Sequence, residues 1–395
     1  MSNLLITANV FGYIGLVLIW VQVVFGSRHI FKGFTKDTVL VNKIHKQLGI
    51  WGFLLIILHP VLEMIVRLSS WYWLFVPNFY TTAEIFITLG RIALIFVIVI
   101  WVTSAIIREK IKWRPWKYIH LISYPTLFLV LFHVPYIGTF FRDYFYVQVF
   151  WFVLLVTSLL AIIVRVMRFA GIGKMVYVLS KKEVVSENII LISFLPKYEN
   201  IVTANIGQHF YLQFGRFLSE HPFTIMEQNN KTGELTFGIR KVGKTFDRLI
   251  ALNIGDEIFI DGPYGVFTKE AWNNDEKVVI SGGIGVTPFV DLVRNYGSSI
   301  SYINCNRNID EAVRRDILIK SKKYLDVLDS YDGEKSMYVR TGRISKELIQ
   351  EIAGENFLNI KYFVCGSPMF IFIVRDMITS LGVKKDSVYF EELGF

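Results

Sequence analysis

Cysteine is nearly absent from this sequence of 395 residues, which contains only Cys305 and Cys365. Two cysteines provide no disulfide framework, which agrees with a reducing compartment. The sequence also has no internal repeats, no low-complexity tails and no calcium-binding loops. These absences exclude a disulfide-stabilised secreted scaffold, a repeat protein and a switch built on calcium loops.

Long apolar runs are abundant and are concentrated in the first 168 residues. Hydrophobic residues make up 53% of the chain and the mean hydropathy is +0.44, which is more than one soluble core requires. The first run has no basic start and no small-residue cleavage site, so we interpret it as a membrane helix and not as a signal peptide. Runs long enough to span a bilayer predict five membrane helices, at Leu4–Phe25, Val39–Val66, Ala83–Ile107, Trp116–Ile137 and Tyr144–Val166.

The excess of positive charge is placed beside these apolar runs. The net charge of +9 could indicate nucleic-acid binding, but its location favours membrane orientation, and we expect no nucleic-acid partner. Basic residues follow the first, third and fifth runs, whereas the opposite connections hold little beyond Arg67 and Arg142. Because positive loops stay in the cytoplasm, we expect a plasma-membrane protein with its soluble half inside and its N-terminus outside.

Four of the seven histidines lie at matched depths in two of the apolar runs. His45 and His59 are fourteen residues apart in the second run, and His120 and His133 are thirteen apart in the fourth. Each separation is about 20 Å along a helix. Two such parallel helices offer two stacked imidazole pairs, and ionisable residues at membrane depth generally mark a function. The pattern predicts that His45 with His120, and His59 with His133, ligate the irons of two haems.

One detail of the fourth run departs from this simple arrangement. Thirteen residues leave His133 about 140° from His120 around an ideal helix. Pro125 lies between them, so we expect a distortion of the helix near this proline. Arg91 is a further charged residue at membrane depth. It either contacts a haem propionate or an anionic product, or pairs with Glu84 or Glu63.

After Lys174 the pattern changes to short strands separated by turn residues. The runs Asn188–Phe194, Gly207–Phe214 and Glu234–Ile239 predict a small antiparallel β-barrel that ends near Trp272. Strands are then expected at Lys277–Ser281, Ser299–Cys305 and Lys361–Cys365, with helices around Pro288–Tyr296, Asp310–Leu328 and Met369–Leu381. This alternation predicts a doubly wound α/β domain. The expected domains are residues 1–172, 173–273 and 274–395.

Several short motifs of the soluble half favour nucleotide binding. Gly282, Gly283, Gly285, Thr287 and Pro288 follow a strand and open a helix, a context that favours a pyrophosphate. An ordinary tight turn is the alternative. Two weaker motifs can hold a flavin ring and its diphosphate, namely His221, Pro222, Phe223 and Thr224, and Gly243, Lys244 and Thr245.

The last motifs lie near the C-terminus. Cys365 ends a strand at the edge where open α/β sheets bind ligands, and Gly366 leaves room for a nicotinamide. A buried structural cysteine is the more common case. Phe395 ends the chain. Because an exposed aromatic ring is unusual at this position, we expect this ring to stack on another group.

Taken together, these residues resemble the NADPH oxidase family, specifically its compact prokaryotic members. The resemblance covers essentially the whole chain, as a ferric-reductase-like haem membrane domain fused to a ferredoxin-NADP-reductase-like module. It implies FAD, two b-type haems and NADPH as electron donor. It also implies that Phe395 covers the flavin until nicotinamide displaces it, and that Asn306 and Arg307 read the adenosine ribose and a 2′-phosphate. The guanidinium of arginine is suited to phosphate.

The expected activity is electron transfer from cytosolic NADPH through FAD and both haems to molecular oxygen outside, which yields superoxide. Reduction of ferric chelates by the same route is the alternative, and a haem-binding or haem-sensing role is a third. This sequence differs from the eukaryotic enzymes of the family, which have six spanning helices and calcium loops, because it has five apolar runs and no such loops. We therefore expect constitutive activity and no obligatory protein partner.

Overall fold

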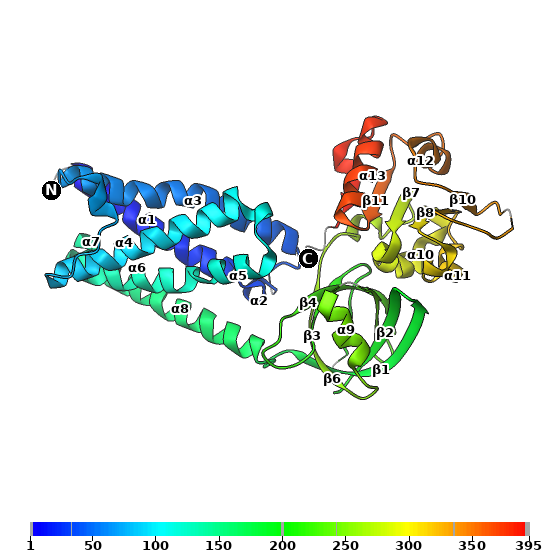
Figure 1. Ribbon diagram of the computed structural model, residues 1–395, viewed down its shortest axis with the longest axis horizontal. Coiled ribbons are helices and arrows are strands. Elements are labelled where there is room, and N and C mark those ends of the chain that lie inside the picture. Colours follow the sequence, from blue (N-terminus) through cyan, green and yellow to red (C-terminus); the bar gives the residue numbers. More distant parts are fainter. Residues whose placement is uncertain (1–2, 33, 199–200, 242, 335, 392–395) are drawn as a thin grey trace. The chain divides into compact units, whose positions relative to one another are not determined.

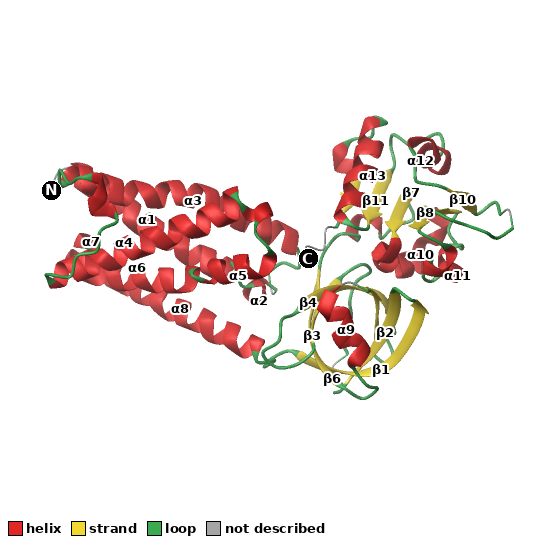
Figure 2. Ribbon diagram, in the orientation of Figure 1, coloured by secondary structure: helices red, strands yellow, loops and turns green. Residues whose placement is uncertain are grey.

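The computed structural model describes residues 3–32, 34–198, 201–241, 243–334 and 336–391. The chain forms two compact units, Met1–Val166 and Met167–Phe395. The first unit is helical, and the second holds a β-barrel and an α/β domain (Figures 1 and 2).

Five spans within the described residues are long and apolar enough to cross a membrane, which confirms the prediction from hydropathy. They are α1 (Asn3–Phe25), α3 (Thr38–Val66), α4 (Thr82–Trp101) with the π-helical turn η2 (Val102–Ile106), α5 with α6 (Trp113–Ile137), and α8 (Phe145–Phe169). In the described connections, four short helices join them, namely α2 (Arg28–Phe31), η1 (Trp71–Leu74), η3 (Arg108–Lys110) and α7 (Thr139–Asp143).

Polar caps and apolar packing define this helical unit. Asp37 Oδ1 accepts the Leu40 N–H at 2.9 Å at the start of α3, and Thr81 Oγ1 accepts the Glu84 N–H at 3.2 Å at the start of α4. Helix α1 packs against α3, and α4 packs against α6. Large apolar side chains such as Trp51 remain exposed on the helices, as expected for surfaces that face lipid.

The fourth span is broken between its two histidines. It consists of α5 (Trp113–Leu121) and α6 (Ser123–Ile137), which meet at Ile122. Pro125 lies in the first turn of α6, where its missing N–H leaves the Leu121 carbonyl without a helical donor. The distortion expected near Pro125 is therefore present. It allows His120 and His133 to face the same partner helix, α3.

The barrel of the second unit is antiparallel, as predicted, and has six strands in the described residues. Its strands pair in the closed order β1-β2-β5-β4-β3-β6. The bounds are β1 (Met175–Ser186), β2 (Ile189–Pro196), β3 (His209–Gln213), β4 (His221–Gln228), β5 (Leu235–Arg240) and β6 (Glu257–Tyr264). Helix α9 (Gly243–Ala251) buries Phe246 and Leu249 in the barrel core, and the 3₁₀ turn η4 (Lys269–Ala271) follows β6.

The remaining strands form a parallel sheet in the order β10-β9-β8-β7-β11-β12. The strands are β7 (Lys277–Gly282), β8 (Ile300–Asn306), β9 (Lys323–Leu328), β10 (Val339–Thr341), β11 (Lys361–Cys365) and β12 (Val388–Phe390). The helices are η5 (Gly283–Phe289), α10 (Val290–Tyr296), η6 (Gly297–Ser299), η7 (Ile309–Glu311), α11 (Arg315–Leu318), α12 (Lys346–Ala353), α13 (Pro368–Ser380) and η8 (Lys385–Ser387). Helices α10 and α11 cover one face and α12 and α13 the other. The predicted doubly wound arrangement is confirmed.

One helix predicted in this domain is wrong. The stretch Asp310–Leu328 is not one helix, because only Arg315–Leu318 is α-helical and Lys323–Leu328 is strand β9. The apolar residues of this stretch were consistent with either period, and pairing with β8 on one side and β10 on the other selects the strand.

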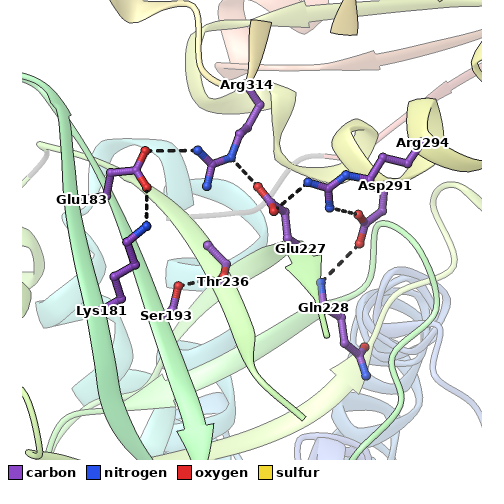
Figure 3. A network of polar contacts seen from close by, with 9 residues as sticks. All are labelled: Lys181, Glu183, Ser193, Glu227, Gln228, Thr236, Asp291, Arg294 and Arg314. Atoms are coloured by element: carbon purple, nitrogen blue, oxygen red, sulfur yellow. Dashed lines mark hydrogen bonds and ion pairs between the residues drawn. The ribbon is translucent and has the colours of Figure 1, made fainter. Parts of the chain in front are cut away.

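A charged network joins the barrel to the α/β domain (Figure 3), and the two also share an apolar core. Arg314, which precedes α11, contacts Glu183 of β1 at 3.1 Å and also contacts Glu227 of β4. Arg294 of α10 contacts Glu227 at 2.8 Å and Asp291 at 2.9 Å. Burial alone would raise the pKa of Glu227, but hydrogen bonds and charges from Arg314 and Arg294 outweigh burial and hold it below its usual value.

Candidate functional site

The four membrane histidines form two ring pairs, combined as the sequence predicts. The ring centres of His45 on α3 and His120 on α5 are 6.0 Å apart. Those of His59 on α3 and His133 on α6 are 6.4 Å apart. An iron with one imidazole on each side needs ring centres about 6 Å apart, since each metal–nitrogen bond is about 2 Å and each nitrogen lies ~1 Å from its ring centre. Both pairs therefore fit a bis-histidine iron.

The Nδ1 atoms of three of these rings have polar partners in the described residues. His59 Nδ1 lies 2.9 Å from the Ala8 carbonyl oxygen, and His133 Nδ1 lies 2.8 Å from that of Phe86. A carbonyl oxygen only accepts, so both rings donate from Nδ1 and leave Nε2 free to ligate a metal. His120 Nδ1 lies 3.3 Å from Ser104 Oγ, and His45 Nδ1 is buried with no hydrogen-bond partner among the described residues.

A π-helical turn places Ser104 beside His120. The turn η2 interrupts the α-helical ladder of α4, and such turns often occur at functional sites. The indole Nε1 of Trp116 donates to Ser104 Oγ at 3.2 Å, and the Trp116 ring stacks on His120 with centres 4.9 Å apart. This side of the His45–His120 pair is therefore fixed by a side-chain network and not by a backbone carbonyl.

A cavity opens beside the His59–His133 pair, and its lining includes Trp73 and Arg91. Arg91 is 5% exposed, its Nη1 lies 3.1 Å from Glu84 Oε2, and its guanidinium lies 4.8 Å from the Trp73 ring centre. Of the two partners considered from the sequence, Glu84 is the one present, because Glu63 pairs with Arg67 at 3.1 Å. The Nε of Arg91 is buried and has no hydrogen-bond partner among the residues that the structure describes.

The two flavin motifs predicted from the sequence lie together. His221 Nε2 is 3.3 Å from Thr245 Oγ1, which joins the start of β4 to the first turn of α9. Pro222 and Phe223 continue β4 to Thr224, whose Oγ1 is buried with no hydrogen-bond partner in the described part of the chain. A buried hydroxyl without a hydrogen-bond partner fits a ligand with polar ring atoms, and the start of helix α9 fits a phosphate. Gly243 and Lys244 begin α9.

The glycine-rich motif and the Cys365 motif also meet, at the point where the strand order reverses between β7 and β11. A Cβ on Gly285 would lie 2.3 Å from the Cys365 carbonyl oxygen, so only glycine allows the loop to pack against the end of β11. Gly283 has a φ of +56°, and Thr287 and Pro288 are buried behind it. Ligands bind open α/β sheets at such a reversal.

The remaining predicted residues have different surroundings. Cys365 is buried, which raises the pKa of its thiol, so the thiol stays protonated. A Cβ on Gly366 would lie 2.6 Å from the Phe370 ring, so this ring occupies the space that the glycine leaves. Asn306 ends β8, and Arg307 follows it with an exposed side chain at the same edge of the sheet. Phe395 lies outside the described residues.

Sequence reasoning missed a buried pair behind this edge. His209 Nδ1 lies 3.4 Å from Glu391 Oε1, and both side chains are about 5% exposed or less. Oε2 of Glu391 has no hydrogen-bond partner among the described atoms, and the charge of Glu391 adds to burial in raising the pKa of Cys365. Neither residue belongs to a motif, and 182 positions separate them in the chain, so no local signal could have found them.

Comparison with known families assigns two parts of the chain. Residues 11–131 match the family described as Ferric reductase like transmembrane component, and residues 176–268 match the Oxidoreductase FAD-binding domain. The chain has the domain architecture of the NADPH oxidase and ferric reductase family. It is a membrane oxidoreductase with a FAD-binding module.

Individual relatives cover parts of this architecture. The chain is 26% identical over 276 residues to Ferric reduction oxidase 5 of Arabidopsis thaliana, which is 66% of this chain and 36% of that protein. It is 24% identical over 156 residues to the Flavohemoprotein of Bacillus subtilis, 36% of this chain and 39% of that protein. It thus spans less than half the length of either relative. In fold, the flavohemoglobin from Malassezia yamatoensis with bound FAD and heme matches with a TM-score of 0.50 and 17% identity, over 100% of this chain and 97% of that one.

Proposed function

We propose that this chain of the NADPH oxidase and ferric reductase family is a transmembrane NADPH oxidase. NADPH bound to the soluble half supplies electrons that pass through FAD and two b-type haems to molecular oxygen on the outer side, where superoxide forms. The observation that carries the proposal is the pair of histidine sites, with ring centres 6.0 and 6.4 Å apart, in one chain with a flavin-type reductase module.

The membrane residues of the proposed route are the four histidines. His45 and His120 ligate the inner iron, and His59 and His133 ligate the outer one. The carbonyls of Ala8 and Phe86 hold the Nδ1 protons of the outer pair, and the Ser104 hydroxyl orients His120. With these histidine nitrogens holding both irons, an acceptor would receive electrons without binding iron.

The soluble residues bind and orient the two nucleotides. We assign FAD to Thr224 of β4 and to the amides that open α9 after Gly243, with Phe395 as the aromatic cover of its ring. We assign NADPH to the glycine-rich turn from Gly282 to Pro288, with Arg307 at the 2′-phosphate and Cys365 and Gly366 beside the nicotinamide. When bound, the flavin supplies the conversion of a two-electron hydride into single electrons, and each haem accepts one electron.

The orientation follows from charge. Basic residues flank the ends of the spans nearest His45 and His120, in the connections after α1 and after α4. The positive-inside rule then places the soluble half in the cytoplasm and the N-terminus outside, in the plasma membrane. We expect the chain to work without an obligatory protein partner.

A ferric-chelate reductase using the same route is the second candidate. It is supported by the charged lining of the cavity beside His59 and His133, where Glu63, Arg67 and Arg91 offer groups that could hold a chelate. The relative Ferric reduction oxidase 5 carries that activity in its name.

The deciding experiment is NADPH-driven cytochrome c reduction by the full chain, loaded with haem and FAD in detergent, with and without superoxide dismutase. Strong inhibition by the dismutase supports superoxide as the carrier. Reduction that is indifferent to the dismutase contradicts the oxidase, and the same preparation is then tested with ferric citrate. His133→Leu serves as the matched control, because it removes the proposed outer iron site and leaves the nucleotide residues intact.

A further inference from the structure

The imidazoles of His59 and His133 each donate to a backbone carbonyl of a neighbouring helix. In both helices a glycine follows that carbonyl by four residues. His59 bonds the Ala8 carbonyl of α1, and Gly12 lies four residues later. His133 bonds the Phe86 carbonyl of α4, and Gly90 lies four residues later. The same spacing occurs on two different helices. We call each combination of a carbonyl with a glycine four residues later a glycine notch.

Helix geometry explains why the spacing is four. The carbonyl of residue i points along the helix toward the N–H of residue i+4. Side chains lean back toward the N-terminus, so the side chain at i+4 lies over the turn that contains this carbonyl. A second donor that approaches the carbonyl from the side therefore needs a very small residue at i+4.

The distances show that both notches are filled by the histidine rings. A Cβ on Gly90 would lie 2.6 Å from Cε1 and 2.7 Å from Nδ1 of His133. A Cβ on Gly12 would lie 3.0 Å from Nδ1 of His59. Any side chain at Gly90 must displace the ring, and one at Gly12 leaves it at the limit of close contact. Both glycines also line the cavity beside the His59–His133 pair.

Other glycines in the described membrane helices do not contact a histidine. A Cβ on Gly52 would meet Leu18 at 3.5 Å, and one on Gly49 would meet Gln22 at 3.6 Å, which are ordinary contacts. The His45–His120 pair is also built differently, with Ser104 beside one ring and no partner for the other Nδ1 among the described residues. The notches thus belong to one of the two pairs.

We propose that Gly12 and Gly90 are positioning residues for the outer iron, which set its reduction potential through the Nδ1 bonds of His59 and His133. The inference rests on the proposed function, because it takes these histidines as haem ligands. An Nδ1–H held by a carbonyl makes the imidazole a stronger electron donor, and this favours the oxidised iron. Weakening either bond raises the potential of that haem alone.

The test compares Gly12→Ala, Gly90→Ala and the control Gly52→Ala in the full chain in detergent. Haem per polypeptide is measured from the pyridine haemochromogen spectrum, and both midpoint potentials are measured by spectroscopic titration. We expect Gly90→Ala to lose about half of the bound haem, because a displaced ligand ring abolishes one site. We expect Gly12→Ala to keep both haems and to raise one midpoint potential, and Gly52→Ala to match the wild type.

The outcomes separate this inference from the function beneath it. Wild-type protein that binds no haem overturns both. Wild-type protein with both haems, and alanine variants at Gly12 and Gly90 that keep its haem content and potentials, overturn only the notch proposal. Equal loss in all three variants also overturns it, since helix glycines in general would then be required. If Gly90→Ala yields no folded protein, the midpoint potentials of Gly12→Ala decide the test. One raised potential supports the notch proposal, and two unchanged potentials overturn it.

Discussion

Ser104 Oγ lies 3.3 Å from Nδ1 of His120, and it occupies this position because α4 ends in a π-helical turn. The same hydroxyl accepts the Trp116 indole N–H. One residue thereby connects two helices of the membrane unit, and the orientation of His120 depends on a local irregularity in its neighbour.

Replacing Ser104 with Ala is therefore expected to disturb one haem site and spare the other. The change leaves the Trp116 N–H unpaired and frees the His120 ring, at a cost of about 1–3 kcal/mol. Spectroscopic redox titration should show one altered midpoint potential. Ser158→Ala is the matched control, because Ser158 is buried in α8 and bonds only the Leu154 carbonyl. Two altered potentials would contradict a role confined to His120.

The network of Arg314 and Glu227 predicts how firmly the barrel holds the α/β domain. Glu227→Gln should lower the free energy of unfolding by about 1–3 kcal/mol, because Arg314 and Arg294 lose the charge that they share. Release of bound FAD during heating measures the effect. Glu257→Gln breaks the exposed pair with Lys197 in the barrel alone, where about 0–1 kcal/mol is expected.

The same network gives a pH dependence. The folded pKa of Glu227 lies below its ordinary value of 4.5. Its stabilising contribution is therefore complete above pH 4.5 and is lost as the pH falls through the lower folded pKa. Glu227→Gln should flatten this part of the stability profile. If the loss of stability below pH 4.5 is the same in Glu227→Gln and in the wild type, Glu227 is not its cause.

The buried Lys277 predicts that the stability of the fold changes with pH in the alkaline range. It is 2% exposed, its ammonium donates to the Asn273 carbonyl and Ser299 Oγ, and burial lowers its pKa to about 8. Between pH 8 and 10.5 the unfolded chain binds the extra proton, so stability rises with pH in this window. The gain is at most about 3 kcal/mol.

Thermal unfolding of Lys277→Met at several pH values tests this prediction. The variant should lose the alkaline rise that the wild type shows. Lys322→Met is the control, because Lys322 is 44% exposed and pairs with Glu276 at the surface. A rise of equal size in wild type and Lys277→Met would assign it to other groups.

Arg307 predicts a preference for NADPH over NADH. Its exposed guanidinium follows β8, whereas Nη2 of Arg340, on β10, lies 3.7 Å from Glu351 Oε1. Arg307→Ala should raise KM for NADPH about tenfold, the loss of one charge-assisted contact to phosphate, and leave KM for NADH unchanged. Steady-state rates with both donors measure the split, with Lys346→Ala of α12 as control. Equal changes for both donors would remove Arg307 as the phosphate reader.

Much of the architecture followed from local pattern. Hydropathy placed five spans, and the spacings of fourteen and thirteen placed four histidines at two depths. Pro125 marked the distortion that the second spacing required. Turn residues and β-branched runs gave the barrel and the α/β domain. The helix predicted for Asp310–Leu328 was wrong because its apolar residues were consistent with the period of a helix and with that of a strand. Only pairing with β8 and β10 selected the strand.

The sequence by itself determined which residues are suited to membrane, metal and nucleotide, because hydropathy, residue chemistry and helical period act over a few turns. Only the tertiary structure decided what each of them touches. The hydroxyl beside His120, the carbonyls that hold His59 and His133, and the pairing of His209 with Glu391 all join different helices or strands. Such contacts depend on how helices and strands pack, and a glycine gains its meaning only when a neighbouring ring fills the space it leaves.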